Sequence, residues 1–250
     1  MSALMLKIIA CVAMVLDHIG YFWGIGSLRI VGRIAFPIFV YLMYNGYCHT
    51  SSKWRYTLRL AFFAVATQIP FNLFMNGSLW RGDGNVFFTL LAALVCLWCA
   101  DAMRRNKILR WFCLVPAIAM CWLYHRGIIV SDYGAKGVLL ILVFYFTDHK
   151  GFWWKVLTVL GFFCAIYYAQ LLSWAKTAVL LLAGGDGQFV GIDSWGRTQA
   201  WSALSLPLIF AYNGTKGPTP RSKLLAKLCQ LGFYLFYPLH MVILWLLSIL

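Results

Sequence analysis

Nine apolar stretches dominate this chain and limit what it can fold into. A helix that crosses a bilayer needs about 20 mostly apolar residues. Stretches near that length recur at 4–24, 28–48, 56–75, 86–103, 108–124, 134–147, 152–183, 199–213 and 225–250. The stretches 134–147 and 199–213 are short for a span, and 152–183 is long enough to be broken or tilted.

Composition agrees with this pattern. Of the 250 residues, 62% are hydrophobic and 11% are charged, whereas about a quarter of a soluble domain is charged. We therefore predict an all-α polytopic integral membrane protein, a helical bundle of about nine transmembrane helices. Because no linker or repeat interrupts the pattern, we treat residues 1–250 as a single transmembrane domain.

The basic residues predict the orientation in the membrane. Lys and Arg number 21 against seven acidic residues, a formal net charge of +14. They concentrate in alternate turns, at 49–59, 101–110, 148–155 and 214–227, and the turns between are poorer in them. The positive-inside rule then predicts a multi-pass membrane protein with the N-terminus cytoplasmic and the C-terminus outside. This explanation of the charge makes the lipid bilayer, and no nucleic acid, the expected partner.

The first apolar stretch carries Lys7, Asp17 and His18. It resembles a signal peptide in position, but it contains these charges and lacks a small-residue cleavage site, so we predict a retained helix. A charge at the centre of a spanning helix costs about 2.5–3.5 kcal/mol on insertion scales. Lys7 lies near the helix end, where it can reach the interface. Asp17 and His18 lie about 15 Å further along the axis, so they must face protein or water.

Two interpretations of this pair stay open. In the structural one, Asp17 forms an ion pair with a neighbouring arginine and His18 donates a hydrogen bond. In the functional one, both belong to a polar chamber, since ionisable residues inside a membrane are candidates for function. Neighbours on a helix point about 100° apart, so Asp17 is expected to pair with Arg33 and not to orient the His18 imidazole.

The predicted topology places further polar residues at the depth of Asp17 and His18. These are Arg33, Gln68, Asn72 and His240, on three further helices, so that four helices contribute polar groups at this depth. A polar chamber at this level would hold His18 as its base, because imidazole has an ordinary pKa near 6.5. His240 follows Pro238, which tends to kink a helix, so a hydrogen-bonded histidine at a packing kink is the alternative.

A cationic entrance to such a chamber is predicted on the cytoplasmic side. Lys7 and His18 are eleven residues apart and so lie on nearly the same helix face. A donor with phosphates would suit Lys7, together with Arg55, Arg59 and the 104–110 cluster; alternatively, these basic residues only set topology.

Further polar candidates are Asp132 and Tyr133 in an outer loop and Asn213 at a cytoplasmic edge. The eight cysteines, including the Cys96–Cys99 pair, lie in or beside apolar stretches, so we expect no metal site.

Several motifs resemble the TraX family of conjugal-transfer membrane proteins. They are LKIIACVAMVLDHIG at 6–20, GRIAFPIF at 32–39, RLAFFAVATQIPFN at 59–72, NVFFTL at 85–90, SDYGAKGVLL at 131–140, ALSLPLIFAYNG at 203–214 and FYLFYPLH at 233–240. The resemblance implies N-terminal acetylation of pilin subunits during conjugation, with acetyl-CoA as the donor.

The wider acyltransferase family 3 is also similar. The resemblance implies a basic residue in the first span followed, eleven positions later, by a histidine implicated in catalysis; Lys7 and His18 match, with lysine where arginine is usual. It also implies a Tyr-x-x-His on the last helix, matched by Tyr237 and His240. The wider family mainly acylates sugar hydroxyls, so the acceptor stays open between a protein N-terminus, a glycan and a small molecule.

The resulting hypothesis is an acetyl-CoA-dependent membrane acyltransferase with His18 as general base, which acts on an amine or hydroxyl. Arg33 is either a donor to the developing oxyanion or the structural partner of Asp17. A proton-coupled transporter that uses Asp17, His18 and Arg33 is the alternative from another class, although the sequence shows no paired interrupted helices in matching halves. A non-catalytic assembly factor for a surface polymer is a third.

Overall fold

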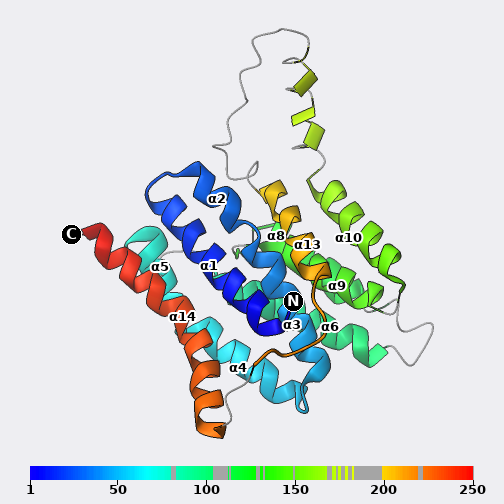
Figure 1. Ribbon diagram of the computed structural model, residues 1–250, viewed down its shortest axis with the longest axis horizontal. Helices are drawn as coiled ribbons and strands as arrows, with labels where there is room; N and C mark the ends of the chain where they lie inside the picture. The colour runs from blue at the N-terminus through cyan, green and yellow to red at the C-terminus, as the bar shows by residue number, and fades with distance from the viewer. Residues whose placement is uncertain are drawn as a thin grey trace. The chain divides into compact units, whose positions relative to one another are not determined.

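In the computed structural model the described residues form helices joined by turns and loops. The described residues are 1–79, 83–103, 112, 114–127, 130–131, 133–148, 150–167, 171–172, 174–175, 178–179, 182, 199–218 and 222–249. In chain order the helices (Figure 1) are α1 (Ala3–Phe22), α2 (Gly26–Gly32), α3 (Ala35–His49), α4 (Lys53–Ala66), α5 (Gln68–Asn76), α6 (Val86–Met103), α8 (Leu114–His125), α9 (Gly134–Thr147), α10 (Phe152–Ile166), the 3₁₀ helix η1 (Gln199–Leu204), α13 (Ser205–Phe210) and α14 (Lys223–Ile249).

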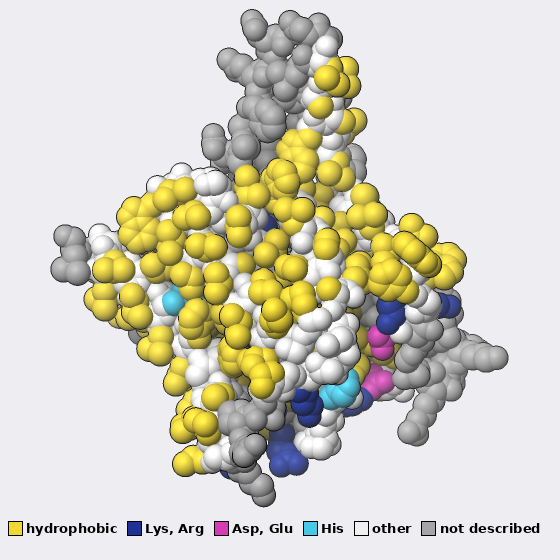
Figure 2. All heavy atoms as spheres, in the orientation of Figure 1, with side chains coloured by type: hydrophobic (Ala, Val, Ile, Leu, Met, Phe, Trp, Pro, Cys, Tyr) yellow, Lys and Arg dark blue, Asp and Glu magenta, His cyan; other side chains and the backbone are white. Residues whose placement is uncertain are grey.

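Five helical stretches are long and apolar enough to cross a membrane. They are Ala3–Phe22, Gly26–His49, Lys53–Asn76, Val86–Met103 and Leu224–Ile249, and shorter apolar helices lie at Gly134–Thr147, Phe152–Ile166 and Gln199–Phe210. Large apolar side chains stand on the surface, among them Trp153, which is 73% exposed, and hydrophobic side chains cover most of the face drawn in Figure 2. Such a surface suits lipid and not water, which supports the predicted all-α, multi-pass membrane class. Nine crossings and their orientation stay predictions.

Two stretches predicted as continuous spans, 28–48 and 56–75, are each interrupted. The first breaks at Arg33 and Ile34, between α2 and α3, and the second at Thr67, between α4 and α5. At Thr67 both the backbone N–H and the side-chain hydroxyl donate to the carbonyl of Phe63, at 3.0 and 2.6 Å. This local side-chain bond competes with regular helical pairing. The periodicity of apolar residues carries no sign of either break, which is why the sequence prediction missed them.

The final predicted spans differ from the helices in length. The predicted 152–183 span contains α10, which ends at Ile166, while residues 168–170 and most of 173–198 lie outside the described part. The predicted 199–213 span consists of η1 followed by α13, six residues each. By contrast, α9 has the predicted bounds of 134–147.

The chain divides into two compact units. Unit 1 comprises Met1–Phe39 and His149–Gly217. In this unit α1 packs along α2, and η1 packs against α2, α10 and α13. The chain start joins the segment after α13, because the Ala3 N–H donates to the Thr215 carbonyl at 2.8 Å. Segments about two hundred positions apart in the sequence thus lie side by side.

Unit 2 comprises Val40–Asp148 and Pro218–Leu250. Helix α6 lies at its centre and packs against α4, α8 and α9, and α14 packs against α5. Buried aliphatic side chains such as Leu94, Leu97 and Ile141 fill the space between these helices.

A buried asparagine supports the break in the third span. Asn85 is fully buried, and its Nδ2 donates to the Ala64 carbonyl at 2.8 Å and to Oε1 of Gln68 at 2.9 Å. Its Oδ1 accepts from the Phe87 N–H at 2.9 Å at the start of α6. One side chain therefore satisfies a helix carbonyl beside the break and caps the next helix, as backbone groups in lipid must be satisfied internally.

We expect Asn85→Leu to lower the apparent melting temperature in detergent. The leucine would leave the Ala64 carbonyl and the Phe87 N–H unsatisfied, at about 1–3 kcal/mol for each buried group. Asn213→Leu is the matched control, because Asn213 is exposed and its Oδ1 accepts from Thr215, two residues away. Equal melting temperatures for the two variants would contradict this role.

Candidate active site

An ion pair joins the first two helices of unit 1. Arg33 Nη2 donates to Asp17 Oδ1 at 2.6 Å and to Oδ2 at 2.9 Å. The Arg33 side chain is 0% exposed and that of Asp17 is 13% exposed. The pairing predicted from helix geometry is therefore confirmed. Removal of one partner of such a buried pair strongly destabilises a protein, because the remaining charge is left uncompensated.

Glycine makes the ion pair sterically possible. A Cβ added to Gly32 would lie 2.2 Å from Cβ of Asp17 and 2.5 Å from its Cα. A Cβ on Gly20 would lie 2.8 Å from the Ile25 carbonyl oxygen. Small residues let helix backbones approach closely in membranes, so α1 and α2 meet at these positions. Arg33 follows Gly32 directly, which brings its guanidinium to the α1 carboxylate.

The other two ionisable residues of α1 share a stripe along the helix. Lys7, Cys11, Met14 and His18 follow one another at spacings of four, three and four, which places them on one face. Cys11 and Met14 are buried, His18 is partly exposed and Lys7 is exposed. His18 is thus neither sealed in the core nor fully on the surface.

Neutral polar side chains extend this site within unit 1. Tyr167, at the end of α10, is 7% exposed. Its side chain is within hydrogen-bonding distance of Ser202 and interacts electrostatically with Arg33. Ser202 Oγ donates to the Gln199 carbonyl at 2.5 Å, and Ser205 Oγ to the Ser202 carbonyl at 2.7 Å. All of them are buried. Tyr167 is therefore a buried neutral group near both the Asp17–Arg33 pair and Ser202 of η1.

The sequence prediction missed this η1 cluster, since it treated 199–213 as one apolar span. A signal was present: Gln199, Ser202 and Ser205 are spaced by three residues in an otherwise apolar stretch. Side chains three apart eclipse one another on a 3₁₀ helix, which is the structure that begins here.

The predicted site residues of unit 2 belong to hydrogen-bond networks. Gln68 Nε2 donates to Asn72 Oδ1 at 2.7 Å and to the Asp83 carbonyl at 2.9 Å, while Asn72 Nδ2 donates to the Leu79 carbonyl at 2.9 Å. These bonds tie the loop after α5 to the helix. Whether Gln68 and Asn72 also line a chamber with Asp17 and His18 stays a prediction, because these residues lie in different units.

The Tyr-x-x-His pair of α14 is buried in unit 2. Tyr237 packs edge-on against Phe87, with ring centroids 5.0 Å apart. His240 Nδ1 donates to the Phe236 carbonyl at 2.7 Å, and α14 continues through Pro238. The hydrogen-bonded histidine of the structural interpretation is thus present.

The remaining candidates lie in loops. Tyr133 is partly exposed and precedes α9. The Asn213 N–H donates to the Met1 carbonyl at 3.0 Å, which gives this residue a structural role. Asp132 and the 104–110 cluster lie outside the described residues. Within the described ranges, no group of three His, Cys, Asp or Glu side chains could hold a metal ion.

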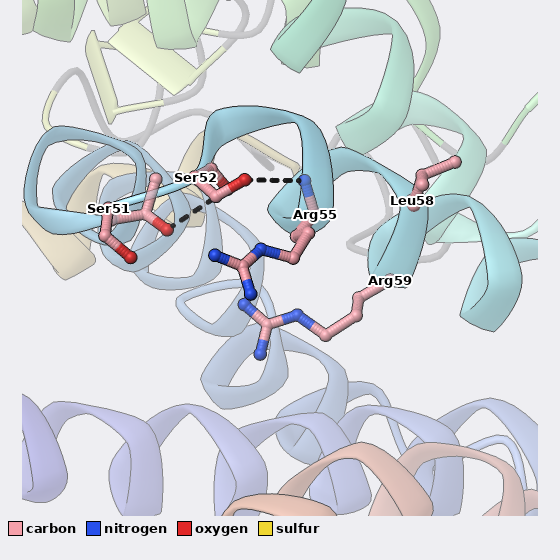
Figure 3. A pocket seen from close by; sticks show the side chains of 6 residues that line it. Ser51, Ser52, Arg55, Leu58 and Arg59 are labelled. Atoms are coloured by element: carbon pink, nitrogen blue, oxygen red, sulfur yellow. Dashed lines mark hydrogen bonds between the residues drawn. The ribbon is translucent and has the colours of Figure 1, made fainter.

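Arg55 and Arg59 line a pocket of about 460 Å³ at the start of α4. Thr50, Ser51, Ser52 and Leu58 complete its lining. Ser52 caps the helix by accepting from the Arg55 N–H at 3.4 Å. The two arginines are one helical turn apart, and Figure 3 shows both guanidinium groups extending to the same side of α4. The helix N-terminus adds partial positive charge, so this pocket suits phosphate.

Lys53 precedes these arginines but does not line the pocket. Its Nζ forms an ion pair with Asp101 and lies 4.5 Å from the centroid of the Tyr47 ring. Tyr47 also donates to Asp101 at 3.0 Å. Lys53 is therefore bound into a structural cluster, which leaves Arg55 and Arg59 as the cations of the pocket.

Together these features define a multi-pass helical membrane protein with an ion pair and a partly exposed histidine in its first helices. Comparison with known families identifies it further. The family model described as "TraX protein" matches residues 2–248, so the chain belongs to the TraX family.

Two relatives extend the comparison. The chain is 29% identical over 262 residues to the "Probable fimbrial assembly protein FimC, serogroup H1" of Dichelobacter nodosus, covering 97% of this chain and 94% of the relative. It is 25% identical over 196 residues to "Uncharacterized protein RP591" of Rickettsia prowazekii (strain Madrid E), covering 76% and 71%. No solved structure matches the chain.

We expect Gly32→Ala to destabilise the protein in detergent and to separate Asp17 from Arg33. The methyl group would overlap Asp17 backbone and side-chain atoms, and such overpacking costs about 1–3 kcal/mol. Gly161→Ala is the matched control in the same unit, because a Cβ there meets no atom within 4 Å. A melting temperature for Gly32→Ala at or above that of Gly161→Ala would show that α1 and α2 do not touch here.

Proposed function

We propose that the protein is an integral membrane acetyltransferase that moves an acetyl group from acetyl-CoA to the N-terminal amine of a pilin subunit. The observation that carries the proposal is the placement of His18, next to a carboxylate that is already committed to Arg33. Family membership supports the reaction, because the TraX family is associated with pilin acetylation. The Dichelobacter nodosus relative, named for fimbrial assembly, supports a pilus-related acceptor.

In the proposed reaction His18 acts as general base. The amine nitrogen attacks the thioester carbonyl, and His18 removes a proton from that nitrogen as the N–C bond forms. The C–S bond then breaks, and the proton passes to the leaving CoA sulfur. The products are an N-acetylated chain and CoA. Imidazole suits both steps because its ordinary pKa lies near neutrality.

Arg33 stabilises the oxyanion that forms on the thioester carbonyl. A fixed, preorganised donor is worth about 10²–10³ in rate, and a mobile one is worth less. The Asp17 pair supplies the fixing, since it involves both carboxylate oxygens and the single nitrogen Nη2. In this proposal Arg33 has both roles that the sequence left open: it is the structural partner of Asp17, and it stabilises the oxyanion.

The donor's phosphates bind at Arg55 and Arg59. Arginine presents several N–H donors that match phosphate oxygens, and both residues line one pocket together with three hydroxyl side chains. Lys7 is exposed on α1 in unit 1, and its predicted part in binding the donor stays a prediction.

We expect His18→Ala to reduce acetyl transfer by at least about 100-fold, the lower range for loss of a general base. The measurement is the release of CoA by purified protein with acetyl-CoA and a pilin N-terminal peptide. His49→Ala is the control, because His49 is exposed and its Nδ1 bonds to the Asn45 carbonyl of its own helix. Normal turnover by a folded His18→Ala variant would disprove the proposed mechanism.

Arg55→Gln combined with Arg59→Gln should raise KM for acetyl-CoA about tenfold and leave kcat nearly unchanged. Exposed charge pairs contribute about 0.2–1 kcal/mol each and are screened by salt, so the difference should shrink as ionic strength rises. Lys227→Gln, on the exposed start of α14, controls for the loss of positive charge. An effect equal to that of Lys227→Gln would exclude a donor site in this pocket.

One observation favours the transporter alternative. Two neighbouring membrane stretches, Gly26–His49 and Lys53–Asn76, are interrupted helices, and broken helices often form transport sites. The sequence prediction had found none. The transporter proposal requires that the purified protein consume no acetyl-CoA with any peptide, so the His18 assay separates the two functions.

A further inference from the structure

A buried acceptor atom lies in η1 of unit 1, outside the residues that the proposed reaction uses. Gln199 is 6% exposed, and its side-chain Oε1 has no hydrogen-bond partner among the residues that the structure describes. A buried polar atom left unpaired costs about 1–3 kcal/mol. Such an atom in a native protein calls for an explanation, and a bound group is one.

The surroundings of Gln199 indicate the kind of group. The neighbouring polar side chains Tyr167, Ser202 and Ser205 are neutral at ordinary pH and buried. The Ser202 and Ser205 hydroxyls donate to backbone carbonyls of η1. A neutral amide oxygen among neutral groups suits a neutral donor, because an isolated charge would be costly to bury there.

The location links this oxygen to the proposed chemistry. Helix η1 packs against α2, which leads into Arg33. Ser202 is one 3₁₀ turn after Gln199. Its side chain is within hydrogen-bonding distance of Tyr167, which interacts electrostatically with Arg33. A peptide whose amine reacts at His18 has its first backbone N–H one residue away from the reacting nitrogen.

We propose that Gln199 Oε1 accepts a hydrogen bond from the first backbone amide N–H of a peptide acceptor. This inference rests on the proposed function for the identity of the acceptor as a peptide. Gln199 then belongs to an acceptor subsite, and Tyr167 and Ser202 hold η1 in position beside Arg33. The subsite binds the peptide backbone, so its contribution to affinity does not depend on the side chains of the acceptor.

The test uses binding without acetyl-CoA, by the full-length protein in detergent. The probes are a peptide of the first ten residues of the host's mature major pilin and the same peptide with an ester in place of its first amide. The ester lacks only the N–H. The wild type should bind the ester about tenfold more weakly, the value of one well-placed hydrogen bond.

Gln199→Met removes the acceptor atom at nearly constant shape. The variant should bind the two probes equally and should melt at or above the wild-type temperature, since an unpaired buried oxygen is replaced by an apolar group. Gln199→Leu also removes the acceptor atom without adding a charge and should bind the two probes equally, which provides a second variant if the first fails to fold. Gln230→Met, on an exposed face of α14, is the matched control and should behave as the wild type.

Equal discrimination by the wild type and Gln199→Met, or no binding of the amide peptide to the wild type, would overturn the subsite. Failure of the proposed function has a different signature. In that case the amide peptide binds with the expected dependence on Gln199, but addition of acetyl-CoA leaves it unacetylated.

Discussion

The contact between Asp17 and Arg33 is the interaction on which the site in unit 1 depends. It places a buried guanidinium against a carboxylate on the neighbouring helix. The close approach exists because Gly32 has no side chain where α2 meets the backbone of Asp17. Each element of this contact is specific: a larger residue at 32 would separate the helices, and loss of either charge would leave the other unpaired inside the membrane.

A consequence for His18 follows from this pairing. Asp17 pairs with Arg33, and neighbours on a helix point about 100° apart, so we do not expect the carboxylate next to His18 in sequence to orient its imidazole. The histidine therefore lies on a face of α1 shared with Lys7, Cys11 and Met14, and it is partly exposed. A base that must meet substrates needs such access, whereas a packing histidine would be sealed among side chains, as His240 is in unit 2.

Much of the fold could be predicted from the sequence because lipid imposes a strong pattern. The length of apolar runs predicted α1, α6, α9 and α14 closely, and helix geometry predicted the Asp17–Arg33 pair. The break at Thr67 could not be predicted, since it is supported by a side chain distant in sequence, Asn85, which donates to the Ala64 carbonyl. The break at Arg33 also left no sign in the pattern of apolar residues. Gln199, Ser202 and Ser205 were missed because residues 199–213 were treated as one apolar span, whereas the chain forms a short 3₁₀ helix followed by α13.

The acetyl group on the acceptor is the most direct test of the central claim. Mature pilin should be purified from host cells that express the wild-type protein, the His18→Ala variant or neither, and its intact mass measured. The account predicts pilin with one added N-terminal acetyl group with the wild type and unmodified pilin in the other two strains. Unmodified pilin in all three, or acetylated pilin in the strain that lacks the protein, would contradict it.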